Sequence, residues 1–456
     1  MSNFIHRLRH WAKACPEKIA LQVDEKRYTY AELLHEIDAL AANLPFSSGS
    51  GVLIQEADPA HQCLLFLASR KAGLRPVLCH PDLPAEDVRN IAESNGLCLF
   101  DGTIGPSNVT NIPAAAEFGI LSSGSTGLPK LFWREEHSWT DYFPIQNKIF
   151  GINEESRLFF HGSFSFTGNF NSFACVFWAG GFARTISAYA PRRWWQIFQE
   201  ESINTLYLLP VKLRQILRAA KTDIAPAMRA VFTGSQSLGK ELSAALQNHF
   251  PKALITLYYG AGELNYITYC HIDEWDLEPG IVGKPFPQVR VRIKDASIYV
   301  TTPFGVIGSD HEMTLGDTGA WTPRGNIRFT GRSNAVINCA GRKISVAKVE
   351  DALRETPLIK DVTIFAVPDT KRGEVPAAAV VVEQKQPLST LRKMALRLPS
   401  IERPRYWLQY AELPLNSCSK PDVHAMPIGN PHKKKTRKRL FLMLQQCKKC
   451  FPEPFL

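Results

Sequence analysis

The chain has 456 residues, and its apolar and charged fractions, 45% and 21%, are those of an ordinary globular protein. This length predicts two or three domains and a core that needs neither disulfides nor metals. The net charge is +10, but the excess of lysine and arginine lies beyond Pro431, where Glu453 is the only acid, so no nucleic-acid-binding face is expected.

The N-terminus and the cysteines indicate where the protein works. Arg7 and Arg9 make the first residues too polar for a secretory signal, and they suit an amphipathic helix. No apolar run is long enough to cross a bilayer. The cysteines are scattered singly apart from Cys447 and Cys450, which favours reduced thiols and a cytoplasmic location.

Helical and strand patterns alternate from the first residue to about residue 113. Apolar spacing predicts helices and short buried strands in turn, at residues 30–43, 51–54, 61–72, 75–79 and 84–96. Strands that alternate with helices predict a parallel sheet of the α/β class.

The middle of the chain keeps this alternation, and the pattern then changes. Strands at 205–209, 230–233 and 254–259 enclose helices at 211–220 and 238–249. After Gly283 short strands with tight turns follow, at 289–293, 297–301 and 326–330. Beyond residue 334 one helix, 346–356, and two strands, 362–367 and 377–383, predict a compact α+β segment.

These patterns predict three parts. Residues 1–333 should form a large N-terminal α/β domain with parallel sheets and a small β-barrel-like subdomain, and residues 334–426 a small α+β C-terminal domain. The basic tail, 427–456, is expected to be disordered or a frameshifted end. The alternative is a membrane-surface anchor, because basic and apolar residues meet in 432–444.

The strongest local signal is Leu121-Ser-Ser-Gly-Ser-Thr-Gly-Leu-Pro-Lys130, directly after an apolar strand. Glycines allow a tight turn, hydroxyl and backbone N–H groups donate to a polyphosphate, and Lys130 adds positive charge. The Gly-Lys-Ser/Thr ending of a Walker A loop is missing. By composition alone, an ordinary Ser/Gly turn with a surface lysine explains the segment equally well.

This segment resembles the phosphate loop of the adenylate-forming superfamily, which comprises acyl-CoA synthetases, nonribosomal adenylation domains and luciferases. Further motifs of that superfamily follow in the same order, between about Ala12 and Met426. The resemblance implies that the loop and Lys130 bind the phosphates of ATP and that Thr126 also contacts Mg²⁺. The loop residues are Ser122, Ser123, Gly124, Ser125, Thr126 and Gly127.

The next motif is Tyr258-Tyr-Gly-Ala-Gly-Glu263, which is similar to the family pattern Tyr-Gly-x-Thr-Glu. The resemblance implies that Tyr259 and Gly260 lie at the adenine. It implies that Glu263 holds Mg²⁺, a hard cation that prefers carboxylate oxygens. Gly262 departs from the pattern, because the family has a hydroxyl side chain there.

Two later motifs supply the ribose contacts, the hinge and the CoA loop by resemblance. Asp317, in Leu315-Gly-Asp-Thr-Gly319, would accept both ribose hydroxyls, and Arg332 would also contact the ribose. Asn334 stands at the family's hinge position, and Gly341 lies in the loop that approaches the pantetheine of CoA. The alternative for Asp317 is an ordinary aspartate in a β-turn, and the alternative for Gly341 is a structural glycine between two strands.

The last motif is Leu413-Pro-Leu-Asn-Ser-Cys-Ser-Lys420, which matches the family at Pro414, Asn416 and Lys420. The resemblance makes Lys420 the mobile catalytic lysine that offsets charge between the acid and the α-phosphate. Ser419 replaces the family's glycine. Without the spacing to Pro414 and Asn416, Lys420 would be interpreted as a solvated loop lysine.

The acyl pocket is assigned to two segments, residues 159–168 and 233–238, with His161, Phe164 and Ser235 as candidate lining residues. Aromatic residues there favour a fatty or aryl acid. Core packing is the alternative for most of these phenylalanines, and a buried core position is the alternative for His161.

The resemblance implies ATP- and Mg²⁺-dependent conversion of a carboxylic acid to acyl-AMP, followed by thioester formation with CoA. The partners would be the acid and CoA, or an acyl carrier protein if the chain is a stand-alone adenylation enzyme. A degenerate relative that binds nucleotide or acyl ligand without turnover is the other alternative, suggested by Gly262 and Ser419. The smaller C-terminal domain would be mobile.

Overall fold

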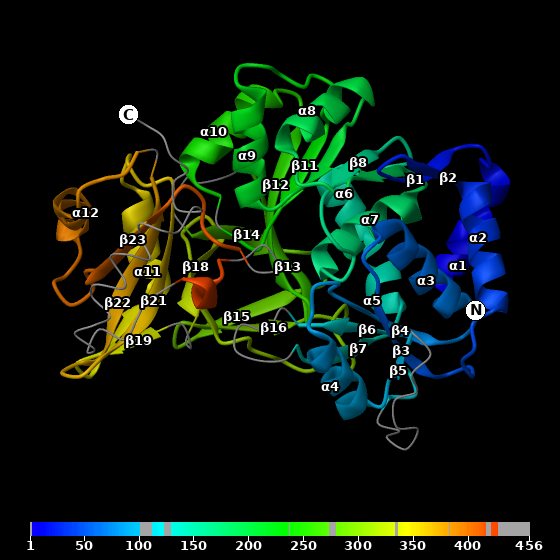
Figure 1. Cartoon of the computed structure of the whole chain (residues 1–456), viewed down its shortest axis with the longest axis horizontal. Helices are drawn as coiled ribbons and strands as arrows, with labels where there is room; N and C mark the ends of the chain where they lie inside the picture. The colour runs from blue at the N-terminus through cyan, green and yellow to red at the C-terminus, as the bar shows by residue number, and fades with distance from the viewer. Residues whose placement is uncertain are drawn as a thin grey trace. The chain divides into compact units, whose positions relative to one another are not determined.

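The computed structural model describes residues 2–100, 112–122, 129–236, 238–272, 280–332, 336–382, 384–415 and 421–426. The chain divides into two compact units (Figure 1). The first comprises the residues up to Arg292 together with Tyr299–Met313 and Pro323–Ile327. The second comprises Ile293–Ile298, Thr314–Thr322 and the residues from Arg328 onward.

The larger sheet of the first unit is mainly parallel. Its strands, in spatial order, are β14 (Ile281–Pro285), β13 (Asn265–His271), β12 (Leu254–Ala261), β11 (Ala230–Thr233), β10 (Thr205–Tyr207), β8 (Arg157–Phe160), β9 (Phe182–Thr185), β1 (Ile19–Val23) and β2 (Lys26–Thr29). The six strands from β12 to β1 are parallel neighbours. β13, β14 and β2 add antiparallel strands at the ends.

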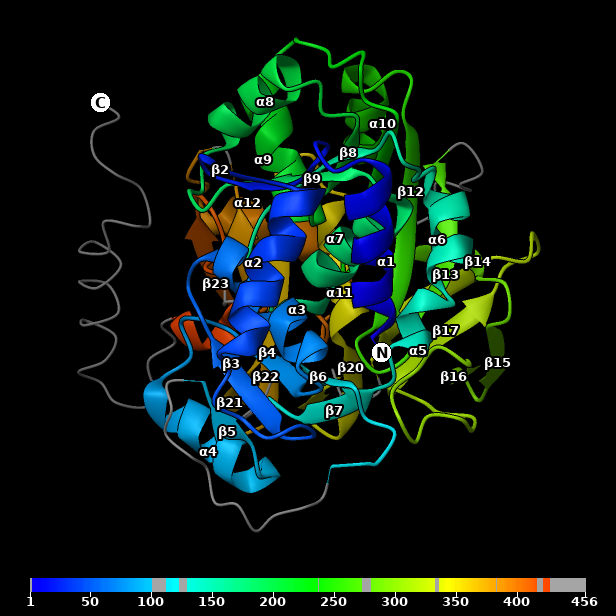
Figure 2. The same cartoon turned by 90° about the vertical axis from the view of Figure 1, so that its right-hand side faces the viewer.

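Helices cover both faces of this sheet, because successive side chains of a strand point to opposite faces. Val231 of β11 joins an apolar core with α8 (Pro191–Glu200), α9 (Pro210–Ala220) and α10 (Lys240–His249). The next residue, Phe232, stacks on Phe150 of α6 (Phe143–Phe150) with ring centroids 4.7 Å apart. Figures 1 and 2 both show α8, α9 and α10 as one group.

A second sheet in the same unit has the order β5 (Cys98–Leu99), β3 (Gly51–Gln55), β4 (Arg75–Cys79), β6 (Phe118–Leu121) and β7 (Leu131–Arg134). All neighbours are parallel except β6 and β7. The helices before and between these strands are α2 (Tyr30–Ala42), α3 (Pro59–Lys71) and α4 (Ala85–Asn95). A capping box between Thr29 and Glu32 fixes the start of α2.

The N-terminal helix α1 (Asn3–Ala14) is held by a carboxylate far along the chain. Glu136 is fully buried and accepts hydrogen bonds from Ser2 Oγ at 2.6 Å and from the backbone N–H of Asn3 at 2.5 Å. Arg70 donates to the same carboxylate at 2.7 Å. A negative charge at a helix N-terminus is favourable, and the ion pair compensates its burial.

The helices α5 (His137–Thr140) and α7 (Thr167–Ala179) complete the first unit. α7 is buried on most of its circumference, from Asn169 to Phe177.

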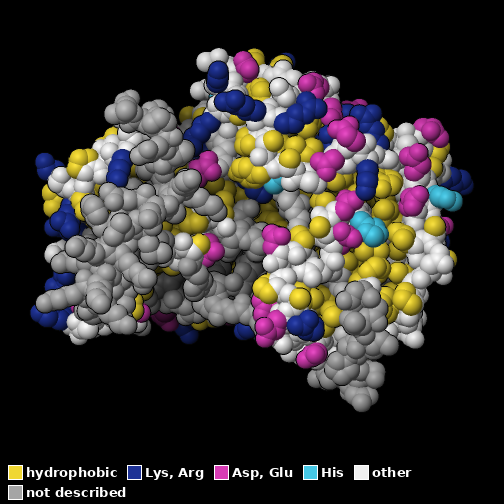
Figure 3. Space-filling view, viewed as in Figure 1, with side chains coloured by type: hydrophobic (Ala, Val, Ile, Leu, Met, Phe, Trp, Pro, Cys, Tyr) yellow, Lys and Arg dark blue, Asp and Glu magenta, His cyan; other side chains and the backbone are white. Residues whose placement is uncertain are grey.

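On the face of the molecule drawn in Figure 3, acidic and basic side chains of the described residues are interspersed.

Residues 290–332 supply short strands, β15 (Arg290–Lys294), β16 (Ser297–Thr301), β17 (Asp317–Trp321) and β18 (Ile327–Arg332). β16 and β17 pair in antiparallel fashion, as the tight turns predict. In the second unit a further sheet has the order β20 (Arg342–Ser345), β19 (Val336–Cys339), β22 (Gly373–Val381) and β21 (Asp361–Asp369), and β23 (Tyr406–Tyr410) pairs with β22.

Two helices pack on this last sheet, α11 (Val346–Arg354) and α12 (Leu388–Met394). Ser345 Oγ caps α11 at the N–H of Lys348, and Val349 and Leu353 enter the core with Leu391 of α12. The predicted fold class is confirmed: the chain has parallel-containing sheets in a large first part and a small α+β part toward its C-terminal end.

Candidate active site

The phosphate-loop segment connects two antiparallel strands of the smaller sheet. Leu121 of β6 is paired with Leu131 of β7. The N–H of Ser122 donates to the carbonyl of Lys130 at 2.8 Å, and the N–H of Lys130 donates to Ser122 Oγ at 2.9 Å. The structure thus brings Ser122 and the exposed Lys130 together. Ser123, Gly124, Ser125, Thr126 and Gly127 lie outside the described residues.

Other predicted site residues follow neighbouring parallel strands of the larger sheet. The register places Phe160 of β8 and Phe232 of β11 level with Tyr207 of β10. His161 therefore follows β8 at the same edge where Ser235 follows β11. Tyr259 lies near the end of β12 at this edge, because Leu257 is level with Thr233. Ligands of open α/β sheets bind at the carboxyl ends of the strands, which makes this edge the candidate site.

Glu263 lies in the turn that joins β12 to β13. Tyr259 is paired with Thr268, and the register shifts between Tyr259 and Gly260. An added Cβ at Gly260 would lie 2.4 Å from the carbonyl oxygen of Asn265, so only glycine fits there. The backbone of the turn is tied down by the N–H of Val306, which donates to the carbonyl of Glu263 at 2.9 Å.

Arg134, which the motifs did not single out, holds the residue before Glu263. It is fully buried at the end of β7 and donates to the carbonyl of Gly262 at 2.5 Å. The same guanidinium donates to the carbonyls of Phe304 at 3.0 Å and Gly305 at 3.3 Å. Burial lowers the pKa of Arg134 to about 9, and the side chain stays charged at neutral pH. Arg134 therefore holds the backbone of the turn from the buried side.

The three candidate acyl-pocket residues differ in their surroundings. Phe164 is 1% exposed and packs against Phe160, with ring centroids 5.2 Å apart, and against Phe173 at 5.1 Å. Its ring thus belongs to a cluster of buried phenylalanines. Ser235, after β11, is exposed and has a positive φ of 65°. These observations leave both assignments as predictions.

His161 has an unexpected neighbour in the first turn of α9. Lys212 Nζ lies 3.2 Å from His161 Nδ1 and donates to the carbonyl of His161 at 2.9 Å. Burial and the positive charge of Lys212 lower the pKa of His161 to about 3, so the imidazole is neutral at physiological pH. Because Nδ1 accepts from the ammonium, the ring proton is placed on Nε2.

The remaining predicted residues belong to the second unit or to undescribed segments. Asp317 is 1% exposed at the first position of β17. Gly341 is exposed, has a φ of 77° and lies in the turn between β19 and β20. Arg332 ends β18, but its side chain is outside the described part, as are Asn334, Lys420 and the basic tail 427–456.

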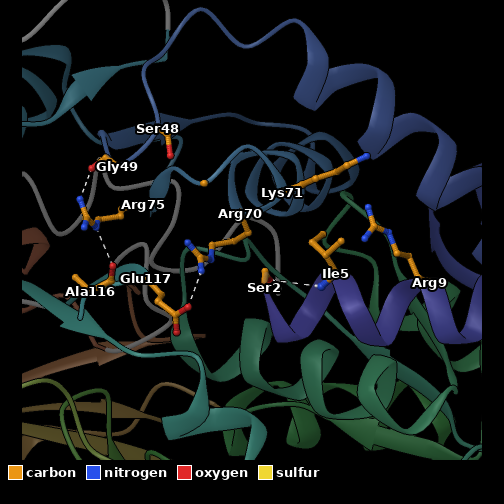
Figure 4. A pocket seen from close by; sticks show the side chains of 11 residues that line it. Ser2, Ile5, Arg9, Ser48, Gly49, Arg70, Lys71, Arg75, Ala116 and Glu117 are labelled. Carbon is orange, nitrogen blue, oxygen red and sulfur yellow. Dashed lines mark hydrogen bonds and ion pairs between the residues drawn. The ribbon is translucent and has the colours of Figure 1, made fainter. Parts of the chain in front are cut away.

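A cavity of about 440 Å³ lies between the start of α1 and the smaller sheet, and no predicted site residue lines it (Figure 4). Arg70 lines it and donates to Glu117 at 3.0 Å and to the carbonyl of Leu74 at 2.8 Å. Arg75, also on its wall, donates to the carbonyl of Ala116 at 2.8 Å. Both guanidinium groups thus donate to acceptors of the protein itself, so they give no sign of a ligand in the cavity.

Within the described ranges, no three His, Cys, Asp or Glu side chains gather as a metal site would require. In the same ranges, no helix combines the length and the apolarity needed to cross a membrane.

Comparison with known proteins covers both parts of the chain. The family model described as AMP-binding enzyme matches residues 8–100 and 107–309. The model described as AMP-binding enzyme C-terminal domain matches residues 348–420.

Among curated relatives, the uncharacterized acyl–CoA ligase YhfT of Bacillus subtilis is 25% identical over 320 residues, which span 66% of this chain and 66% of YhfT. Tyrocidine synthase 3 of Brevibacillus parabrevis is 22% identical over 91% of this chain, which spans only 7% of that synthase.

Among solved structures, the o-succinylbenzoate CoA synthetase MenE of Bacillus subtilis shares the fold. Its complex with the acyl-adenylate OSB-AMP has a TM-score of 0.79 at 18% identity and covers 93% of this chain and 98% of its own. Its complex with ATP and a magnesium ion has a TM-score of 0.76 at 17% identity, over 91% of this chain and 97% of its own.

Proposed function

The chain belongs to the AMP-binding enzyme family, and on that premise we propose that it is an AMP-forming acid–thiol ligase that uses ATP, Mg²⁺ and CoA. In the first step a carboxylate oxygen of the acid attacks the α-phosphorus of ATP, and pyrophosphate leaves. In the second step the CoA thiolate attacks the acyl carbon of acyl-AMP, and AMP leaves. The observation that carries the proposal is the succession of both family parts on one chain, at residues 8–100 and 107–309 and at residues 348–420.

The first step brings two anions together, so its catalysis consists mainly of positioning and charge stabilisation. Lys130 stands where the ends of the phosphate loop are hydrogen-bonded to each other, and there it would offset phosphate charge. Lys420 is proposed to supply a second positive charge between the carboxylate and the α-phosphate. Tyr259 would lie against the adenine.

The turn at Glu263 fits a magnesium ion that is shared with ATP. The carboxylate of Glu263 and the hydroxyl of Thr126 would be the protein ligands, with the other positions left to phosphate oxygens and water, which is the usual way that Mg²⁺ is bound in nucleotide sites. Arg134 and the N–H of Val306 hold the backbone that carries this carboxylate. When bound, the ion would neutralise charge on the leaving pyrophosphate.

In the second unit, Asp317 and Arg332 are proposed to hold the ribose hydroxyls. We place the domain boundary at Asn334 and propose that residues 334–426 rotate about it between the two half-reactions. The exposed glycine turn at Gly341 would then admit the pantetheine chain of CoA. The described cysteines are free thiols, which accords with a proposed cytoplasmic location.

The test is acid-dependent release of pyrophosphate from ATP and Mg²⁺, measured over a panel of fatty, aryl and dicarboxylic acids with and without CoA. We expect turnover with one acid class and acceleration by CoA. A folded protein that releases no pyrophosphate with any acid would overturn the proposal and favour a binding protein without turnover, for which Gly262 and Ser419 are the sequence argument.

A second candidate is transfer of the acyl group to a carrier protein. It is favoured by the similarity to tyrocidine synthase 3 over 91% of this chain. The two acceptors are separated by comparing CoA with a phosphopantetheine-loaded carrier protein at equal concentration. Release that CoA leaves unchanged, and that a carrier protein accelerates, would select the second candidate.

A further inference from the structure

Lys212 is a buried cation at the candidate acyl site. It is the third residue of α9, directly after the parallel strand β10, and its side chain faces the interior with 6% of the residue exposed. The ammonium lies 3.2 Å from His161 Nδ1 and 2.9 Å from the carbonyl oxygen of His161. The carbonyl is neutral, and the imidazole is neutral as well, because the pKa of His161 is lowered to about 3.

No carboxylate of the described residues forms an ion pair with this ammonium within 4.0 Å. Asp24 raises the pKa of His161 slightly through its charge, but its carboxylate accepts hydrogen bonds from the N–H and the hydroxyl of Ser187, at 2.9 and 2.6 Å. Burial lowers the pKa of Lys212 to about 8. A buried charge without a counter-ion is costly, and such groups cluster at functional sites.

The surroundings of Lys212 belong to the same sheet edge as the candidate site. Nζ lies 3.6 Å from the position of a Cβ added at Gly162, and the amide nitrogen of Asn169 lies 2.8 Å from that position. β10 is two strands away from β12, which carries Tyr259. With a strand spacing of ~4.8 Å, the ends of β10, which leads to α9, and of β8, which leads to His161, are about 10 and 14 Å across the sheet from β12, the strand that leads to Glu263.

We propose that Lys212 binds a carboxylate at the end of the acid substrate remote from the reacting carboxylate, so that the substrates are dicarboxylic acids. The proposal rests on the proposed ligase function. The reacting carboxylate is activated near the phosphate loop and Glu263, and the second one enters beside α9 as a counter-ion for Lys212 that the described residues do not supply. A wholly apolar fatty chain would leave the buried ammonium unpaired.

The test compares octanoate and suberate, which have equal chain length and differ in the second carboxylate, by kcat and KM in CoA-dependent pyrophosphate release. The wild type should favour suberate by at least tenfold in kcat/KM. Lys212→Met should lose that preference mainly through a higher KM for suberate, with kcat/KM for octanoate unchanged or raised. The matched control, Lys240→Met, removes an exposed lysine at the start of α10 and should keep the preference.

Charge reversal adds a readout that a structural role would not move. Lys212→Glu, if folded by circular dichroism, should prefer 8-aminooctanoate to suberate. An unchanged ratio of suberate to octanoate in Lys212→Met would overturn the proposal, even if overall activity falls.

The proposed ligase function and the proposed role of Lys212 can be refuted independently of each other. If the wild type turns over no acid, the ligase function fails, and calorimetric binding of suberate in the presence of AMP then decides the lysine's role. Binding that is lost in Lys212→Met and kept in Lys240→Met supports it, and equal binding to both variants overturns it.

Discussion

Replacing Lys212 with methionine should stabilise the ligand-free protein, and most strongly at neutral pH. The pKa of Lys212 is lowered from 10.5 to about 8 by burial. Each pKa unit corresponds to about 1.4 kcal/mol, so carrying the charge in the folded state costs about 3 kcal/mol at pH 7. Methionine has a similar length and no charge, but it gives up the hydrogen bonds to His161. We expect a net gain of about 1–3 kcal/mol.

The sign of the pH dependence follows from proton linkage. Between pH 8 and 10.5 the unfolded chain keeps the lysine proton and the folded chain loses it, so the penalty shrinks as the pH rises. The advantage of the methionine variant should therefore fall by about 2 kcal/mol between pH 7 and pH 9.5. Lys240→Met, which removes an exposed charge, should show no such trend.

The assay is thermal unfolding of wild type and both variants across this pH range, read as differences in Tm so that the titration of other groups cancels. The two-unit chain need not unfold in one step, so the transition compared is the one whose Tm the Lys212 substitution shifts. A methionine variant that is less stable than wild type at pH 7, or a difference that is flat with pH, would refute the reasoning.

Lys420→Ala should nearly abolish acid-dependent pyrophosphate release and spare thioester formation from supplied acyl-AMP, and equal loss in both half-reactions would contradict its proposed role. Arg134→Met leaves three carbonyls without their donor, so we expect a loss of about 2–4 kcal/mol in stability and a raised KM for MgATP. Unchanged Tm and KM would argue against Arg134 as the support of the turn. Gly262→Ser restores a hydroxyl, and its Cβ would lie 3.3 Å from the end of the flexible Ile120 side chain. The variant should fold with a near-normal Tm and release pyrophosphate faster than wild type, whereas a slower rate would show that the hydroxyl is not what the turn lacks.

Much of the fold was predictable because most helices and strands show their period in the sequence. The predicted helix at 30–43 is α2, and the predicted strand at 230–233 is β11. Helix α7 was not predicted. It is surrounded by core on nearly all sides, so it lacks the polar face that marks an amphipathic helix.

The candidate site was predictable only as far as short motifs reach. Ser122 and Lys130 are close in sequence and in space, and Tyr259 and Glu263 are close in sequence. Lys212 is different, because its significance depends on burial beside His161, a residue from another strand. Periodicity gives no sign of such a contact.

Arg134 and Glu136 were missed for the same reason, since their partners at Gly262 and Ser2 are more than a hundred positions away. In the sequence they look like charges at the end of an exposed strand. Only the fold shows that both are buried.

The hydrogen bond between Ser2 and Glu136 also determines when the first helix can reach its final contacts during synthesis. The two residues are 134 positions apart, so the partner of the first helix does not yet exist when that helix leaves the ribosome. At about 5–20 residues per second, the delay is about 7–27 s. For that time Phe4, Ile5 and Leu8, which are all buried in the finished protein, lack their final cover. The nascent chain therefore exposes an apolar surface of the kind that chaperones bind, and slower translation before codon 136 would prolong that exposure.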